Sequence, residues 1–289
     1  MRFIRCPAVM GIVNVTPDSF SDGGRYVDPA VAVEHGLALA EAGAGVLDVG
    51  GESTRPGAVP VGAEEERRRV VPVVRRLAAE AGVPVSIDTT KAAVAAAALD
   101  AGAEVVNDVS AGRADPEMLP LVARAGAGYV AMHMKGTPAT MQRDPSYADV
   151  VVEVTGFLRH RLEAAAEAGI DRSRLVADPG IGFGKTAAHN VELLARLPEL
   201  VEALDGIPVL VGTSRKAFIG SLLAPPGGPA LGVEDREDGT LATVVWALDR
   251  GASMVRVHDV RPAVEAVRLL EALAAADPGP PPEASGVAS

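Results

Sequence analysis

Residues 175–185 read Leu-Val-Ala-Asp-Pro-Gly-Ile-Gly-Phe-Gly-Lys, and they set the pattern of the whole chain. A short apolar run ends on a polar residue, Asp178, and a glycine-rich turn separates it from a stretch of helical composition. An apolar run without polar alternation predicts a strand that is buried on both faces. A polar side chain at the end of such a strand is typical of a ligand site.

The same pattern recurs along the chain. Polar residues end short apolar runs at Asn14, Asp48, Asp88, Asn107, His133, Asp178, residues 214–216 and residues 256–258. Stretches of helical composition lie between them, at residues 28–42, 63–81, 91–101, 115–125, 147–168, 189–204, 236–250 and 261–275. Gly-Ala turns fit helix ends that lead into the next strand. Eight such units in 289 residues predict an α/β fold, a (β/α)8 TIM barrel with its substrate site at the C-terminal ends of the strands.

A doubly wound open sheet has the same alternation and is the alternative fold. Its ligand crevice forms at one topological switch point, whereas nearly every strand of a barrel can deliver a side chain to the same mouth. Polar residues follow nearly every predicted strand of this chain. Their distribution therefore favours the barrel.

The composition is typical of a soluble globular protein. Hydrophobic residues make up 48% of the chain, and no apolar run approaches the roughly 20 residues that a membrane span needs. The net charge of −11 argues against broad nucleic-acid binding. The single cysteine, Cys6, allows no internal disulfide, which favours the cytoplasm. We expect one barrel domain over residues 1–276 and a disordered Pro-rich tail at residues 277–289.

Arginine stands at three predicted strand ends. Thr54 and Arg55 lie between glycines, which let the backbone approach a ligand closely. Arg215 and Arg256 follow two later strands. One arginine could be an ordinary surface charge, but three at one barrel mouth indicate an anion site, because the guanidinium fork recognises phosphate oxygens. The sequence therefore predicts a phosphate or pyrophosphate pocket, and the loop around Phe20 has the composition of a lid over it.

Two acids, Asp88 and Asp178, end predicted strands. A lone aspartate at such a position commonly caps the helix or turn that follows. Together with Asn107 and Lys216, however, these carboxylates supply the donors and acceptors that a planar heterocycle needs, and Asp178 could accept a pair of N–H bonds. A glycosidase-like carboxylate pair is the alternative, which the low aromatic content of 3% disfavours.

The nucleotide and metal motifs that spacing can reveal are missing. Gly184-Lys185-Thr186 resembles the end of a nucleotide phosphate loop, but that pattern requires glycine where Pro179 stands. The five histidines form no H-E-x-x-H pair, and one cysteine cannot build a thiolate cluster. A pyrophosphate ligand would bring Mg2+ with it, held by few protein atoms.

These motifs resemble those of the dihydropteroate synthase family, over about residues 10–260. The matching segments are residues 14–23 (Asn-Val-Thr-Pro-Asp-Ser-Phe-Ser-Asp-Gly), 50–57 (Gly-Gly-Glu-Ser-Thr-Arg-Pro-Gly), 87–89 (Ile-Asp-Thr), 107–110 (Asn-Asp-Val-Ser), 132–134 (Met-His-Met), 178–185, 214–216 (Ser-Arg-Lys) and 256–259 (Arg-Val-His-Asp). The resemblance implies a cytoplasmic, homodimeric transferase of folate biosynthesis that uses Mg2+ and is a sulfonamide target. It would condense 6-hydroxymethyl-7,8-dihydropterin diphosphate with 4-aminobenzoate to give 7,8-dihydropteroate and pyrophosphate.

The resemblance also implies a role for each matching residue. The residues that bind the pterin would be Asp88, Asn107, Met132, Asp178, Phe183, Lys216 and Arg256. The diphosphate would be bound by Asn14, Arg256 and His258, with Asn14 also on Mg2+, and the aminobenzoate by Phe20, Thr54, Arg55, Pro56, Ser214 and Arg215. The catalytic residues would be Asp88, Lys216, Arg256 and His258. The reaction would be an SN1-like displacement, in which Asp88 stabilises a cationic pterin methylene and the basic groups stabilise the leaving diphosphate. Closed loops would keep water away from the cation.

Two other functions fit parts of the pattern. A pterin-binding methyltransferase domain shares the barrel and the Asp-Pro-Gly motif, but residues 52–57 and 214–216 have no evident purpose in methyl transfer. A pterin-binding protein without activity is the alternative outside enzymes, and no catalytic residue of the family is missing. Ala217 and Lys135 are among the small departures from the family pattern, which leave sulfonamide sensitivity open. Alanine-rich stretches at residues 240–250 and 264–275 are the predicted dimer surface.

Overall fold

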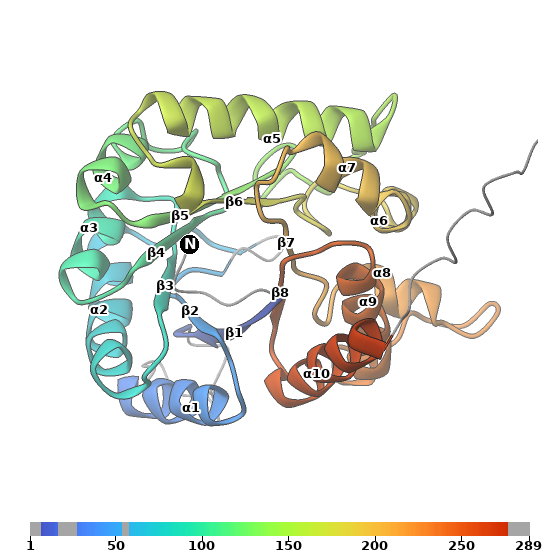
Figure 1. Ribbon diagram of the computed structural model, residues 1–289, viewed down its shortest axis with the longest axis horizontal. Helices are drawn as coiled ribbons and strands as arrows, with labels where there is room; N and C mark the ends of the chain where they lie inside the picture. Colours follow the sequence, from blue (N-terminus) through green and yellow to red (C-terminus); the bar gives the residue numbers. More distant parts are fainter. Residues whose placement is uncertain (1–6, 17–27, 54–57, 277–289) are drawn as a thin grey trace, which may run out of the picture.

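The computed structural model describes residues 7–16, 28–53 and 58–276. Parallel strands form one barrel (Figure 1) in the order β6-β5-β4-β3-β2-β1-β8-β7. Their bounds are β1 (Ala8–Asn14), β2 (Val46–Gly50), β3 (Val85–Asp88), β4 (Val105–Asp108), β5 (Gly128–Met132), β6 (Leu175–Asp178), β7 (Leu210–Val211) and β8 (Met254–Val257). A single bridge between Ala177 and Val209 joins the first and last strands of this order. The predicted (β/α)8 barrel is confirmed.

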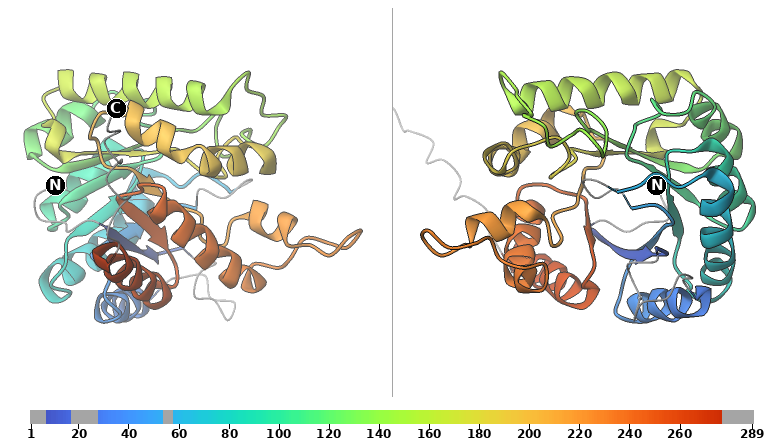
Figure 2. Two further views of the ribbon diagram at one scale, coloured as in Figure 1. Left: turned by 45° about the vertical axis from the view of Figure 1, so that its right-hand side comes forward. Right: turned by 180° about the vertical axis from the view of Figure 1, so that it is seen from behind.

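Helices cover the outside of the barrel, as the two further views also show (Figure 2). They are α1 (Pro29–Glu41), α2 (Ala63–Glu80), α3 (Ala92–Asp100), α4 (Met118–Ala125), α5 (Val150–Glu167), α6 (Ala187–Ala195), α7 (Leu197–Ala203), α8 (Ala217–Leu222), α9 (Glu237–Asp249) and α10 (Val260–Ala276), with 3-10 turns η1 (Arg172–Arg174) and η2 (Glu234–Arg236). None of the helices in the described ranges is long and apolar enough to cross a bilayer.

Two details of the helices differ from the sequence prediction. The helix expected over residues 189–204 is divided into α6 and α7 at Arg196, whose ψ of 21° leaves the helical region. Pro198 then stands in the first turn of α7, where its missing N–H costs nothing. The short helix α8 has no counterpart among the predicted helices, because its six residues are too few to show helical periodicity.

Side-chain caps fix where several helices begin. Asp28 precedes α1 and accepts a bond from the N–H of Ala30 at 2.8 Å. Asp149 accepts bonds from Val151 and Val152 at the start of α5, at 2.9 and 3.0 Å. Each cap satisfies backbone donors that the first turn of a helix leaves without an internal partner. The boundaries of these helices therefore follow directly from the local sequence.

The two faces of the strands build two different cores. One face packs beneath the helices in a large cluster that includes Leu47, Ile87 and Leu175. The other face points into the barrel and forms a separate apolar layer, which we call the lower layer: Ala8, Met10, Val46, Val105, Val130, Val176, Leu210 and Met254. Residues two apart on a strand share a face, so the next inward positions lie one step closer to the C-terminal ends of the strands. Four of those positions are polar: Asp48, Asn107, Asp178 and Arg256.

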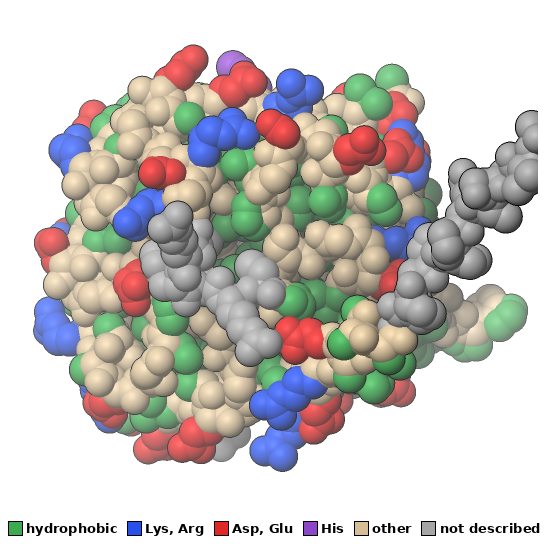
Figure 3. Space-filling model, in the orientation of Figure 1, with side chains coloured by type: hydrophobic (Ala, Val, Ile, Leu, Met, Phe, Trp, Pro, Cys, Tyr) green, Lys and Arg blue, Asp and Glu red, His purple; other side chains and the backbone are tan. Residues whose placement is uncertain are grey.

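The surface seen in Figure 3 has a mixed charge pattern. Acidic and basic side chains are interspersed around the rim of this face, and apolar side chains gather toward its middle. The outer helices add local pairs of opposite sign, such as Arg76 with Glu80 on α2, which are joined at 3.0 Å and largely exposed. Exposed pairs of this kind contribute little to stability.

Candidate active site

One pocket of about 650 Å³ opens at the C-terminal ends of the strands. All the predicted site residues within the described ranges line it: Asn14, Asp88, Asn107, Met132, Asp178, Phe183, Ser214, Arg215, Lys216, Arg256 and His258. They come from seven different strand ends and the loops that follow them. The other four predicted residues, Phe20, Thr54, Arg55 and Pro56, lie outside the described residues, as do Cys6 and the tail at 277–289. The structure therefore brings together every predicted residue that it describes.

A charged network forms the floor of the pocket. The guanidinium of Arg256 donates from Nε to Asp48 Oδ2 at 2.7 Å and from Nη2 to Asp88 Oδ2 at 2.9 Å. Asn107 donates from Nδ2 to the same Asp48 oxygen at 2.9 Å. Asp48 is fully buried, and its Oδ1 has no hydrogen-bond partner in the structure. Arg256 is thus held by two carboxylates from neighbouring strands, β2 and β3.

The two acids predicted to bind a heterocycle, Asp88 and Asp178, have raised pKa values. Burial raises the pKa of the Asp88 carboxyl to about 7, although the positive charge of Arg256 opposes the shift. Burial likewise raises the pKa of Asp178 to about 6, opposed by the N–H of Gly180 and by Lys216. Gly180 donates to Asp178 Oδ1 at 2.7 Å, which orients the carboxylate. Perturbed carboxyl groups in a pocket are typical of functional sites.

An apolar wall faces these acids. Val109, Met132, Met134 and Met141 form a small buried cluster, and the ring of Phe183 packs against it. The ammonium of Lys216 lies 4.0 Å from the centre of that ring. A cation over an aromatic face is attracted to it, and more strongly when water is excluded. The pocket therefore combines a flat apolar wall with hydrogen-bonding groups at its edges, which suits a planar polar ring.

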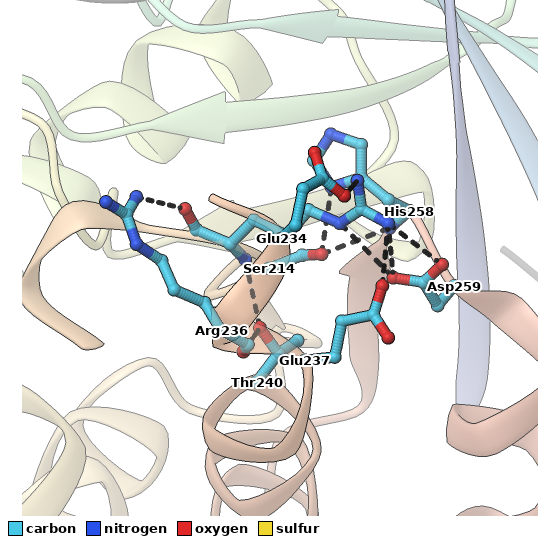
Figure 4. Close-up of polar contacts among 8 residues, drawn as sticks. Ser214, Glu234, Arg236, Glu237, Thr240, His258 and Asp259 are labelled. Atoms are coloured by element: carbon cyan, nitrogen blue, oxygen red, sulfur yellow. Dashed lines mark hydrogen bonds and ion pairs between the residues drawn. The ribbon is translucent and has the colours of Figure 1, made fainter. Parts of the chain in front are cut away.

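The side of the pocket formed after β7 and β8 is drawn in Figure 4. Ser214 Oγ lies 2.9 Å from His258 Nδ1 and accepts a bond from the His258 backbone N–H at 3.2 Å. Arg215 has a left-handed backbone, with φ of 57°, and its guanidinium contacts Asp259 at 3.1 Å and Glu237 at 3.2 Å. An anion that binds Arg215 must compete with these carboxylates.

Asn14 adds a carboxamide to the pocket. It ends β1, and its side chain lines the pocket. Within the described residues, no group of three or more histidine, cysteine or acidic side chains is placed to hold a metal ion. A Mg2+ ion that arrives with a diphosphate takes most of its oxygens from phosphate and water. A single carboxamide oxygen at this position fits such an ion.

Asp48 has no predicted role, although it is among the polar strand ends that the sequence reveals. The register pairs Gly50 of β2 with Asp88 of β3, so Asp48 lies one inward step deeper than Asp88. That depth explains why it contacts Arg256 and lines no part of the pocket surface. The register between the strands would have identified Asp48 as the deeper inward position, but the sequence alone does not give that register.

Comparison with known proteins agrees with this geometry. The sequence profile of the family described as "Pterin binding enzyme" matches residues 10–258. A dihydropteroate synthase of Mycobacterium leprae is 52% identical over 271 residues, which cover 93% of this chain and 94% of that protein. The chain belongs to the dihydropteroate synthase family of pterin-binding enzymes. The predicted resemblance is confirmed.

Solved structures of this family have the same fold. Dihydropteroate synthase from Xanthomonas albilineans with 4-aminobenzoic acid superposes with a TM-score of 0.85, at 52% identity and 93% coverage of both chains. The same enzyme in complex with 7,8-dihydropteroate has a TM-score of 0.83 at 48% identity and covers 95% of this chain and 96% of that chain. As a member of the dihydropteroate synthase family, the chain is a transferase of folate biosynthesis, as its motifs predict.

Proposed function

We propose that this protein condenses 6-hydroxymethyl-7,8-dihydropterin diphosphate with 4-aminobenzoate, releasing pyrophosphate and 7,8-dihydropteroate. The observation that carries the proposal is the convergence of Asp88, Asn107, Asp178 and Lys216 beside the ring of Phe183 in one pocket. The relatives support it, because one solved structure holds 4-aminobenzoic acid and another holds 7,8-dihydropteroate.

The pterin ring is proposed to lie between the apolar wall and the floor network. Asp178 accepts two parallel N–H bonds from the amino-pyrimidine edge when it is ionised, because a carboxylate has two acceptor oxygens. Asn107 and Asp88 meet other polar atoms of the ring, and Lys216 donates to an acceptor while it stays over Phe183. Met132 and Phe183 line the ring face, and Arg256 packs along it.

The diphosphate is proposed to bind where Asn14, Arg256 and His258 line the pocket. Arg256 has donors to spare, because two of its N–H groups reach Asp48 and Asp88 and a guanidinium has five. Asn14 would supply a carboxamide oxygen to Mg2+, which when bound would neutralise charge on the diphosphate. The basic groups thus lie where negative charge grows as the C–O bond breaks.

Bond cleavage leaves a cationic methylene on the pterin, and the amine of 4-aminobenzoate attacks it. Asp88 is proposed to stabilise this cation, since its carboxylate is buried in a region of low dielectric. No covalent bond to the protein forms. The aminobenzoate would lie near Ser214 and Arg215, and we propose that Phe20, Thr54, Arg55 and Pro56 complete its site.

A cytoplasmic homodimer belongs to the same proposal. Leu269 and Leu273 on α10 are 61% and 58% exposed, and Trp246 on the adjoining α9 is 42% exposed. Large exposed apolar side chains on packed helices are typical of subunit contacts. Light scattering on the wild-type protein and on a Leu269→Glu, Leu273→Glu double variant tests this surface. A wild-type monomer at micromolar concentration contradicts it.

Pyrophosphate release tests the reaction itself. The purified protein receives dihydropterin diphosphate, Mg2+ and 4-aminobenzoate, and matched controls omit the arylamine or the metal. We expect release that depends on the arylamine, with dihydropteroate as the second product. Tight pterin binding without release would contradict the synthase and favour methyl transfer or a binding protein without activity.

A further inference from the structure

The loop between β6 and α6 lies in backbone contact with the segment that follows β5. Gly180 and Gly184 both have left-handed backbones, with φ of 65° and 63°. A β-carbon on Gly180 would lie 1.9 Å from the carbonyl oxygen of His133, and one on Gly184 would lie 2.3 Å from that of Lys135. Real atoms cannot approach so closely. Glycine is therefore required at both positions, and the two segments fit together as one rigid unit.

Side chains from other elements fasten the same loop. Gln142 donates to the carbonyl of Gly182 at 2.8 Å, and Asn190 on α6 accepts from its N–H at 2.7 Å. The hydroxyl of Tyr147 donates to the carbonyl of Gly184 at 2.7 Å. A loop held in this way is already in one conformation before any ligand arrives, which lowers the entropy cost of binding.

The side chain of Lys185 also holds this loop, and the residue is almost completely buried. Only 2% of the residue is exposed, and its Nζ donates to the carbonyls of Gly180 at 2.9 Å and Phe183 at 3.1 Å. The third contact of Nζ is His133 Nδ1 at 2.8 Å. An ammonium group has three N–H donors, so these three acceptors satisfy it completely. Two of them belong to the loop, and the third belongs to the segment that follows β5.

The imidazole of His133 is suited to accept that bond. Burial lowers the pKa of His133 to about 2, and the positive charges of Lys185 and Arg113 act in the same direction. The ring is therefore neutral, and Nδ1 can be an acceptor. Phe157 meets the ring edge to face, with centres 4.9 Å apart, and holds its orientation. His133 thus provides a fixed anchor on the barrel for the ammonium of Lys185.

The cost of burying this lysine indicates more than a role in stability. Burial lowers the pKa of Lys185 to about 7, a shift that the charge of Asp178 opposes. None of the three groups that it contacts is a carboxylate, and buried charges without a counter-ion in contact are unfavourable. An apolar side chain of similar length would avoid the cost of burying the charge, but it would leave these three acceptors without a donor. An apolar side chain could not hold the carbonyls of Gly180 and Phe183 in place, as the ammonium does.

We propose that Lys185, anchored on His133, is a positioning residue that sets the place of Phe183 and of the Asp178 carboxylate for pterin recognition. The inference rests on the proposed function, because the pterin is the ligand that those two groups would meet. Lys185 acts through the loop, since its own ammonium is fully engaged by protein acceptors. Its removal should therefore affect the pterin and leave unchanged the aminobenzoate site, whose described residues Ser214 and Arg215 follow β7.

The test compares Lys185→Met with Lys135→Met in the full chain. Met keeps the length and apolar stem of lysine in both variants. Lys135 is a matched control because it lies two residues from His133, but its ammonium is exposed and contacts the Ser146 carbonyl, Glu153 and the ring of Tyr147 instead of the loop carbonyls. The measurements are the Kd for the ligand 6-hydroxymethylpterin, detected by fluorescence, the KM for each substrate, kcat and Tm.

For Lys185→Met we expect the pterin Kd and the KM for dihydropterin diphosphate to rise about tenfold, as for loss of hydrogen bonds to a charged group. The KM for aminobenzoate should stay close to the wild-type value, the Tm should fall because three buried acceptors lose their donor, and Lys135→Met should match the wild type throughout. A folded Lys185→Met protein with the wild-type pterin Kd overturns the inference. Equal losses for both substrates overturn it too, because they indicate a general structural role.

A second variant keeps the test decisive if Lys185→Met does not fold. His133→Leu removes the anchor and leaves the lysine, so we expect the pterin Kd to rise severalfold while the KM for aminobenzoate is unchanged. His133→Asn restores an acceptor oxygen and should recover most of the affinity. An unchanged Kd in His133→Leu overturns the inference. Failure of the wild-type protein to bind 6-hydroxymethylpterin counts against the proposed function instead.

Discussion

The two ends of the barrel interior are built from the same strands and have opposite chemistry. The lower layer consists of apolar side chains such as Val176 and Met254, which are almost completely buried. Two residues further along those strands stand Asp178 and Arg256, which are ionisable and line the pocket. Inward positions that are two residues apart on one strand therefore differ in role. The lower side chain stabilises the fold, and the upper one costs stability and binds ligands.

The energetic difference has a clear physical origin. Burial of a valine or methionine side chain contributes about 1.5–3 kcal/mol to folding. Burial of a carboxylate is unfavourable, which is why the pKa values of Asp88 and Asp178 are raised to about 7 and about 6. Substitutions at the two ends should therefore separate activity from stability.

The largest effect is expected from Asp178→Asn at the upper end. A carboxamide has one acceptor oxygen and an NH2 group that would face a ring N–H, so the paired bonds to the pterin are lost. We expect kcat/KM for dihydropterin diphosphate to fall by about a thousandfold or more, measured by pyrophosphate release. Circular dichroism confirms the fold of the variant. A decrease of less than tenfold would show that Asp178 does not recognise the pterin.

A substitution in the lower layer should reduce stability and leave activity unchanged. Met254→Ala leaves a cavity directly beneath Arg256, and we expect the free energy of unfolding to fall by about 2–5 kcal/mol. Below its melting transition the variant should keep a kcat/KM close to that of the wild type. Urea denaturation and pyrophosphate release measure the two quantities. Loss of activity in a fully folded variant would mean that the two ends are not independent.

Variation of pH sharpens the comparison, because the buried carboxyls titrate near neutrality. The pKa of Asp178 in the folded protein is raised, so its contribution to stability is present below about pH 4 and is lost as the pH rises through about 6. At pH 8 the ionised group costs about 3 kcal/mol. Asp178→Asn should therefore have a higher Tm than the wild type at pH 8, and the difference should shrink toward pH 4.

Pterin affinity should follow the opposite trend with pH. Protonated Asp178 accepts fewer bonds, so the Kd for the ligand 6-hydroxymethylpterin should rise as the pH falls through about 6. Fluorescence titration between pH 5 and 8 would detect the change, and Asp178→Asn is the control that should remove it. An affinity that does not vary with pH in the wild type would exclude Asp178 as the group responsible.

The smallest effect is expected at the rim of the pocket. Asp259→Asn removes one of the carboxylates on Arg215, but Glu237 remains in contact at 3.2 Å. Because Asp259 is 41% exposed, the loss of stability should be about 0.2–1 kcal/mol. Arg215 also becomes a better partner for an anion, and the KM for aminobenzoate should fall slightly. A higher KM would show that Asp259 itself supports the aminobenzoate site.

The sequence predicts the barrel because each strand end carries its own local signal, an apolar run followed by a polar residue. It also predicts the pocket residues, since parallel strands bring their C-terminal ends to one mouth. It could not predict the depth of Asp48, which depends on the register between strands. Nor could it predict the role of Lys185, whose three partners are set by the path of a loop with several left-handed glycines.

The weakest joint of the barrel lies between β6 and β7, where a two-residue strand and one bridge close the ring. On one side of this joint stands Asp178, and on the other the chain leads to Lys216. Amide hydrogens at such a joint exchange through local opening more readily than those of fully paired strands. A pterin that contacts both Asp178 and Lys216 would bridge this joint and stabilise the pairing of β6 with β7. Ligand binding should then slow hydrogen exchange most in the two strands that the backbone itself connects least.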